Sequence, residues 1–119
     1  MLVVTTWNAP GYEVREVKGE VFGVVVRSRS IVMNIGAMFR SLFGGEIKTY
    51  TDLLESTRQQ AIDRMIANAA SRGANAVLSM RFDASEIANT MSEIVAYGTA
   101  VVVEPEPRPT PPARPAPQA

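Results

Sequence analysis

The segment from Ile94 to Val103 most constrains the fold, because it places apolar side chains on both sides of a strand. Successive side chains of a β-strand point to opposite faces of the sheet. One face would carry Ile94, Ala96, Ala100 and Val102, and the other Val95, Tyr97, Val101 and Val103. A strand of this kind needs cover on both faces, so we expect packing partners on either side of it.

Three other segments have strand-like patterns. Apolar residues recur at every second position from Ala76 to Phe82, which is the period of a strand with one apolar face. We expect this strand to form a hairpin with Ile94 to Val103, joined by a polar connection from Asp83 to Thr90. The other two are a short strand from Met1 to Thr6, ended by a turn at Asn8 to Gly11, and a long strand from Tyr12 to Arg27, broken or bulged at Lys18-Gly19.

Two segments have helical periodicity. Asp52 and Glu55 have capping-box spacing, and Arg72-Gly73 closes the segment, which predicts a helix of about five or six turns. Its apolar stripe contains Leu54, Ala61, Ile62, Met65, Ile66 and Ala69. A shorter helix is predicted where Ile35, Met38, Phe39 and Leu42 share one face, and it would stop at Gly44-Gly45.

The order of these elements predicts an α+β fold in two layers, a small antiparallel sheet carrying one long helix. With 119 residues the chain is the size of one domain, which we place at residues 1–103. From Glu104 to Ala119 nearly every second residue is proline, so residues 104–119 are predicted to be a disordered tail. Its PxxP spacings suit either a flexible spacer or a partner that recognises polyproline.

One long helix covers one face of a small sheet, and only the short helix remains for the other face. A second copy of the chain is the simplest cover for the remaining apolar surface. The alternative is a monomer in which residues 35–43 fold back over it.

Composition excludes several kinds of function. The sequence contains no cysteine and no histidine, which removes disulfides, thiolate metal sites and histidine-based catalysis. Its 12 basic and 12 acidic residues balance, so we expect no nucleic-acid partner. No apolar run approaches the about 18 residues that span a bilayer, and no signal-type segment follows the N-terminus. A cytoplasmic location without a membrane partner is the expectation.

Several short motifs, in order, resemble the YbjQ-like family of small bacterial proteins, to which heavy-metal binding is ascribed. They include Thr5-Thr6, the PGY of Pro10 to Tyr12, and the GGE of Gly44 to Glu46, and they continue with Tyr50, Leu54, Arg58, Ala61 and Met65, the GANAV of Gly73 to Val77, the RFD of Arg81 to Asp83 and the AYGTAV of Ala96 to Val101. The resemblance implies a dodecin-like subunit assembled as a homopentameric ring. The sequence departs from many members at Glu46 to Thr49, where they often carry small residues.

Acidic residues near the predicted hairpin are the candidate metal ligands. Asp83, Glu86 and Glu93 are oxygen donors, which suit a hard cation better than a soft one. In a ring they would also form a band that attracts cations. They are equally well explained as ordinary surface acids on a solvated turn, and no cofactor is identified by the sequence.

Two arginines are candidates for ligand or interface contacts. Arg58 falls on the apolar stripe of the long helix, where its guanidinium needs a partner: a carboxylate such as Asp83 or Glu46, in the same chain or across an interface, or an anionic ligand. Arg81 and Tyr97, on adjacent strands, would make either a stacking contact or a ligand contact.

These observations leave two hypotheses for function. The first is a non-enzymatic homo-oligomeric module, which binds a small ligand or ion or serves as a scaffold through surfaces that form on assembly. The second is an enzyme with its site at a subunit interface, using a carboxylate, Tyr50 or Tyr97, and Arg58 or Arg81.

Overall fold

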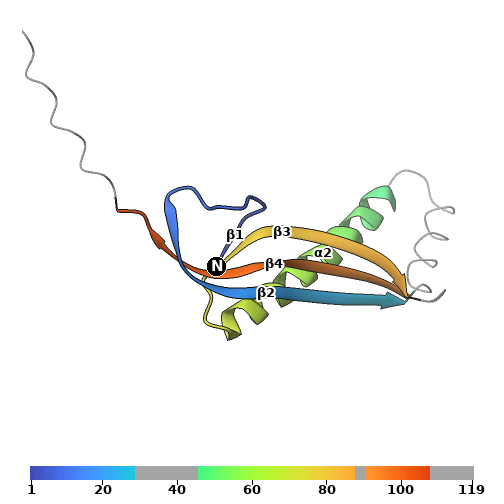
Figure 1. Ribbon diagram of the computed structural model, residues 1–119. Helices are drawn as coiled ribbons and strands as arrows, with labels where there is room; N and C mark the ends of the chain where they lie inside the picture. Colours follow the sequence, from blue (N-terminus) through green and yellow to red (C-terminus); the bar gives the residue numbers. More distant parts are fainter. Residues whose placement is uncertain (29–45, 88–90, 108–119) are drawn as a thin grey trace, which may run out of the picture.

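The computed structural model describes residues 1–28, 46–87 and 91–107 of the chain. Its elements are β1 (Leu2–Val3), β2 (Tyr12–Ser28), α2 (Glu46–Ser71), β3 (Ala76–Ile87) and β4 (Met91–Pro105), shown in Figure 1. The predicted short helix around Ile35 to Leu42 and most of the predicted tail lie outside the described residues.

The fold is α+β, as predicted, but the sheet is mixed rather than antiparallel. Its strand order is β1-β3-β4-β2, and β4 runs antiparallel to both of its neighbours. The short β1 instead pairs in parallel with β3, with Leu2 opposite Ala76. The prediction failed there because β1 and β3 are joined by a crossover through β2 and α2, and that connection permits parallel pairing.

Besides a register shift between Val14 and Glu16 in β2, two bulges interrupt the long strands. The predicted break in β2 is confirmed, since its register against β4 shifts between Val17 and Gly19, where Gly19 has a φ of 100°. A second bulge, which the sequence did not predict, shifts β3 between Leu78 and Arg81. Ser79 occupies it with a φ of 54°, a left-handed conformation that is uncommon for residues other than glycine.

The hairpin is longer than predicted. β3 continues to Ile87 and β4 begins at Met91, so most of the connection predicted from Asp83 to Thr90 is strand. The polar residues of this segment were interpreted as a turn, but exposed strand ends accept polar side chains as readily as turns do.

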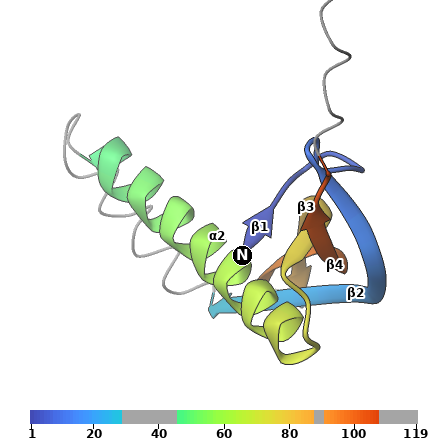
Figure 2. The same cartoon turned by 90° about the vertical axis from the view of Figure 1, so that its left-hand side faces the viewer.

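The long helix begins at Glu46, six residues before the predicted start at Asp52, and contains 26 residues. Asp52 and Glu55 therefore lie inside the helix. Figures 1 and 2 show that the N-terminal part of α2 extends away from the sheet. Leu54, predicted on the buried stripe, lies in this part and is 41% exposed.

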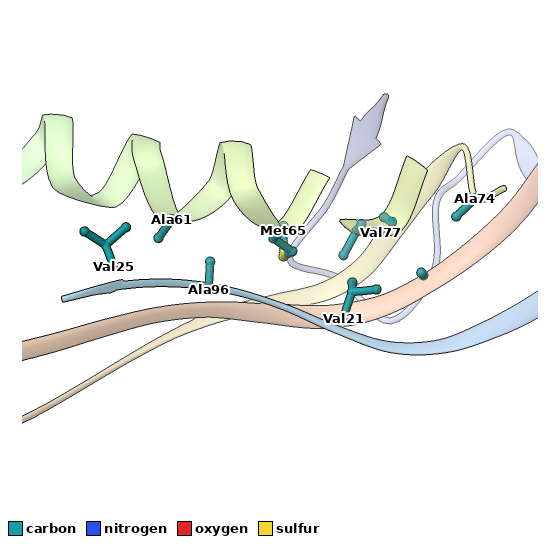
Figure 3. Close-up of a cluster of buried hydrophobic side chains, with 9 residues drawn as sticks. Val21, Val25, Ala61, Met65, Ala74, Val77 and Ala96 are labelled. Atoms are coloured by element: carbon teal, nitrogen blue, oxygen red, sulfur yellow. The ribbon is translucent and has the colours of Figure 1, made fainter. Parts of the chain in front are cut away.

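The main core lies between α2 and the sheet. Ala61, Met65 and Ala69 recur every four residues along α2 and are fully buried against β2, β3 and β4. Figure 3 shows Ala61 and Met65 on the side of α2 that faces the sheet, close to Val21, Val25, Val77 and Ala96. A Cβ at Gly23 would lie 2.0 Å from the carbonyl oxygen of Ala61, so the backbones of α2 and β2 are in direct contact at this glycine.

A smaller core occupies the opposite face of the sheet, at the end where β1 pairs. Here the N-terminal segment packs over β3 and β4, and the buried residues are Ala9, Ala76, Leu78, Val101 and Val103, with Leu2 and Val4 against them. The prediction that β4 is apolar on both faces is confirmed. Among the described residues, no helix has the length and apolarity that crossing a membrane requires.

Candidate functional site

The face of the sheet opposite α2 is the candidate site. Beyond the part covered by the N-terminal segment, the strand registers place side chains on this face in three rows, each running from β3 through β4 to β2. We call it the open face, and its rows are Arg81–Tyr97–Phe22, Asp83–Val95–Val24 and Ser85–Glu93–Val26.

One side of the open face is apolar. The side chains of β2 on this face are exposed, with Phe22 at 46% and Val26 at 47%, and Tyr97 in β4 is 37% exposed. The rings of Phe22 and Tyr97 are tilted against each other with centroids 6.5 Å apart. Contiguous exposed apolar side chains of this kind are typical of interaction surfaces.

The other side of the open face is polar, and several of its groups are held by hydrogen bonds. Arg81 donates through Nη1 to the carbonyl oxygens of Thr5, at 2.7 Å, and of Met80, at 2.8 Å. Ser85 Oγ donates to Glu93 Oε2 at 3.1 Å. The cation of Arg81 therefore ties β3 to the N-terminal segment, beside the ring of Tyr97 that the register places opposite it.

The structure does not bring the three candidate metal ligands together within one chain. Asp83 and Glu93 lie on the open face, whereas Glu86 pairs with Ser92 on the face that carries α2. Among the described residues, there is no group of three acidic side chains suited to hold a metal ion. A cation site on the open face would need further donors, beyond those that the described residues of one chain bring together.

Arg58 lies beside the buried stripe of α2 rather than on it. Thr57 takes the buried position, at 3% exposure, and its Oγ1 donates to the carbonyl oxygen of Leu53 at 2.9 Å. The Arg58 guanidinium instead lies over the ring of Phe82, 5.4 Å from its centroid, a cation–π contact.

The partners proposed for Arg58 are not brought to it within the chain. Asp83 follows Phe82 in β3 and therefore points to the opposite face of the sheet. The side chains of Glu46 and Tyr50 lie outside the described residues. A carboxylate partner for Arg58 stays a prediction, and it would come from another part of the chain or from another copy.

A second arginine between the layers was missed by sequence reasoning. Arg27, near the end of β2, donates through Nη2 to Gln60 Oε1 at 3.0 Å. Its Nε is buried without a hydrogen-bond partner in the part of the chain that the structure describes. The only available signal was a cation directly after the apolar run of β2, which is also typical of a strand end.

Polar side chains of α2, together with Arg72 directly after it, hold the outer edge of β2, which sequence reasoning also missed. Arg64, Asn68 and Arg72 donate to the carbonyl oxygens of Val24, Phe22 and Glu20, respectively. Donors four residues apart on a helix meet acceptors two residues apart on a strand that runs past it. The regular spacing of these polar residues was visible in the sequence.

Asn75, directly before β3, binds β4 at the end of the sheet where β1 pairs with β3. Its side-chain amide donates to the carbonyl oxygen of Val103 at 2.9 Å and accepts from the Val103 N–H at 2.8 Å. This side chain therefore pairs with β4 as a strand backbone would. The asparagine of the GANAV motif has a structural role in this arrangement.

A sequence model of the YbjQ family, described as "Putative heavy-metal-binding", matches residues 1–104. The chain belongs to the YbjQ family. A UPF0145 protein of Bradyrhizobium sp. (strain ORS 278) is 58% identical over 105 residues, which cover 88% of this chain and 95% of the relative. A UPF0145 protein of Sulfurisphaera tokodaii is 56% identical over 103 residues, which cover 87% and 90%.

One solved structure has a fold similar to that of this chain. It is the crystal structure of a protein of unknown function from Pediococcus pentosaceus ATCC 25745, with a TM-score of 0.56 and 14% sequence identity. The alignment covers 87% of this chain and 98% of the other. At this identity the likeness concerns the fold alone.

The heavy metal in the description of the YbjQ family does not fit the donors of this chain. Soft metal ions prefer thiolate and imidazole ligands, and the sequence contains neither cysteine nor histidine. The remaining donors are carboxylates and other oxygen groups, which suit hard cations.

Proposed function

We propose that this chain is a non-enzymatic module that assembles with copies of itself. The assembly we propose is the homopentameric ring that the resemblance to the YbjQ family implies. Assembly covers the open face, and the assembled surfaces bind a small ligand or ion or serve as a scaffold. One observation carries the proposal. Phe22, Val24 and Val26 form an exposed apolar column on a strand whose other face is a well-packed core.

Charge supports a second copy as the occupant of the open face. The polar side of this face carries both signs, with Arg81 next to Asp83 and Glu93, so it complements surfaces of either sign. The chain has a formal net charge of zero, so its copies do not repel one another over long distances. An apolar centre with a polar rim is the usual anatomy of a protein interface.

Assembly also suggests the kind of ligand. A ring repeats Asp83 and Glu93 once in every copy, which multiplies carboxylates that are too few in one chain. Oxygen donors gathered in this way suit a hard divalent cation such as Mg²⁺ or Ca²⁺. We therefore favour a hard cation over a heavy metal as the bound ion.

Native mass spectrometry of the purified protein tests this proposal, because it reports the number of subunits and any retained mass together. We expect a closed assembly of several copies for the unmodified chain. Phe22→Ser removes the largest exposed apolar side chain of the open face and should break the ring while leaving the chain folded. Ala67→Ser, an exposed position on α2, is the matched control and should leave the assembly unchanged.

A monomer at micromolar concentration, with circular dichroism showing a folded chain, would overturn the proposal. An assembly that Phe22→Ser leaves intact would also overturn it, because the open face would then not be the contact surface.

A further inference from the structure

The outer edge of β3 has no strand beside it over residues 82–86, within the part of the chain that the structure describes. On its inner side β3 pairs with β4 as far as Ile87. On its outer side the N-terminal segment pairs only with the beginning of β3, and its last backbone hydrogen bonds join Val4 to Met80 and Thr6 to Ser79. Beyond this point, the described residues place no backbone partner along the outer edge of β3.

The hydrogen bond of Met80 shows which backbone groups point outward. Its N–H donates to the carbonyl oxygen of Val4, on the outer side of β3, at 3.0 Å. Because the direction of backbone groups alternates along a strand, those of Phe82, Ala84 and Glu86 also point outward. The N–H of Ala84 agrees with this assignment, since it donates to the side-chain Oδ1 of Asp83, at 3.0 Å, in an exposed contact rather than to β4.

The opposite edge of the same sheet is closed. Along β2, two side chains of α2 and that of Arg72 directly after it bond the outward carbonyl oxygens of Val24, Phe22 and Glu20. Proteins commonly block exposed edges in ways like this, because a free edge recruits another strand. The sheet therefore offers an incoming strand the edge of β3 and denies it most of the edge of β2.

We propose that residues 82–86 of β3 pair with the same residues of a second copy, antiparallel and about a two-fold axis at Ala84. The partner's β3 is favoured over its β2 because the carbonyl groups of β2 are already bonded within its own chain. A two-fold contact of this kind joins two sheets into one continuous sheet.

The side chains on this edge complement one another in that register. Phe82 would lie opposite the partner's Glu86, whose carboxylate would reach the Arg58 guanidinium that lies over the Phe82 ring. Asp83 would lie opposite the partner's Ser85, so no two carboxylates face each other directly. α2 packs mainly on β2 and β4, and Ala84 and Glu86 are exposed, which leaves space beside β3 for the partner.

This contact is separate from the ring. The ring covers the open face, whereas the two-fold contact uses the edge of β3. The two-fold contact would join one ring to another, so the joined assembly would have an even number of subunits.

A single cysteine tests the contact directly, because the chain has no cysteine of its own. Opposed residues of a hydrogen-bonded antiparallel pair have Cα atoms about 5.5 Å apart, within disulfide range. We expect Ala84→Cys to form a disulfide-linked dimer on mild oxidation, at a rate that dilution leaves unchanged as long as the two-fold contact stays saturated. Ala67→Cys, on exposed α2, is the control and should stay mostly monomeric on denaturing gels. Equal cross-linking of both variants would overturn the proposal.

A charge exchange tests the register. Glu86→Arg should weaken the two-fold contact by about tenfold or more, since it opposes two cations, and adding Arg58→Glu should restore it. Analytical ultracentrifugation of these variants in the Phe22→Ser background removes the contribution of the ring. If Glu86→Arg left the association constant unchanged there, or the double variant failed to recover it, the proposed register would be wrong. A defective ring with a normal Ala84→Cys cross-link would instead count against the ring alone.

Discussion

The two faces of one sheet differ in how completely they are packed, although both are apolar. On the face that carries α2, Val21 and Val25 are buried beneath a helix that touches the strand backbone at Gly23. On the open face, the neighbouring residues Phe22, Val24 and Val26 remain exposed. Alternate residues of β2 therefore have different roles. Those on the face with α2 stabilise the folded chain, whereas those on the open face are available to a partner.

The largest effect should come from the point where α2 and β2 touch. Gly23→Ala would place a Cβ atom 2.0 Å from the carbonyl oxygen of Ala61 and 2.4 Å from the backbone nitrogen of Met65. Because both are backbone atoms, the whole helix must move, and we expect a loss of about 3 kcal/mol or more in the free energy of unfolding. Urea denaturation measures it.

Gly11→Ala is the control for this change. A Cβ there meets nothing within 4 Å, but the φ of 86° strains any residue with a side chain. We expect a loss of about 1–2 kcal/mol from strain alone. If the two variants were equally stable, the close packing of α2 on β2 would be refuted.

Two adjacent valines compare the faces directly. Val25→Ala removes buried methyl groups and should lower the free energy of unfolding by about 2 kcal/mol, whereas Val24→Ala should lower that of the isolated chain by less than about 1 kcal/mol. Self-association should respond in the opposite order, with Val24→Ala the more damaging variant. Denaturation of each variant in the Phe22→Ser background, at low protein concentration, measures the free energy of unfolding. Light scattering of the single variants measures self-association. If Val24→Ala and Val25→Ala had equal effects in both assays, the proposed difference between the two faces would be wrong.

Asn75 tests the end of the sheet where both faces are covered. Asn75→Ala removes both hydrogen bonds to Val103 and leaves two backbone groups of β4 without these partners. We expect the free energy of unfolding to fall by about 1–2 kcal/mol without a change in subunit number. Thermal unfolding and light scattering measure the two quantities, and a change in subunit number would place this end of the sheet in an interface.

The smallest effect should come from the contact of Arg58 with Phe82. Arg58→Ala removes one exposed cation–π contact, so we expect the monomeric chain to lose about 0.5–1 kcal/mol. Chemical denaturation of the Phe22→Ser background, with and without this change, isolates the effect. A loss above about 3 kcal/mol would indicate a buried ion pair within the chain instead.

Local patterns predicted the elements better than their ends and partners. The alternation along β4 and the glycine bulge in β2 follow from the period of a strand and from backbone sterics, which short sequences express. The start of α2 was misplaced because a capping-box spacing at Asp52 also occurs inside helices. The pairing of β1 with β3 depends on residues more than seventy positions apart, which no local pattern contains.

The candidate site shows the same division. The opposition of Arg81 and Tyr97 was foreseen because both lie on strands of one hairpin. The sequence did not predict the separation of Glu86 from Asp83 and Glu93, because polar residues in this segment indicate a turn, where side chains have no fixed face. Arg58 was placed on the buried stripe because a shift of one residue on a helix turns a side chain by about 100°.

The most direct test of the central claim is the accessibility of the open face in solution. In a Val24→Cys variant the only thiol lies on this face, and its rate of reaction with a maleimide can be compared with that of Ala67→Cys over a range of protein concentrations. We expect Val24→Cys to be protected when the protein is concentrated and to react as fast as the control when it is diluted below the assembly threshold. Fast labelling at every concentration, or protection that dilution does not remove, would contradict the claim that a second copy covers this face.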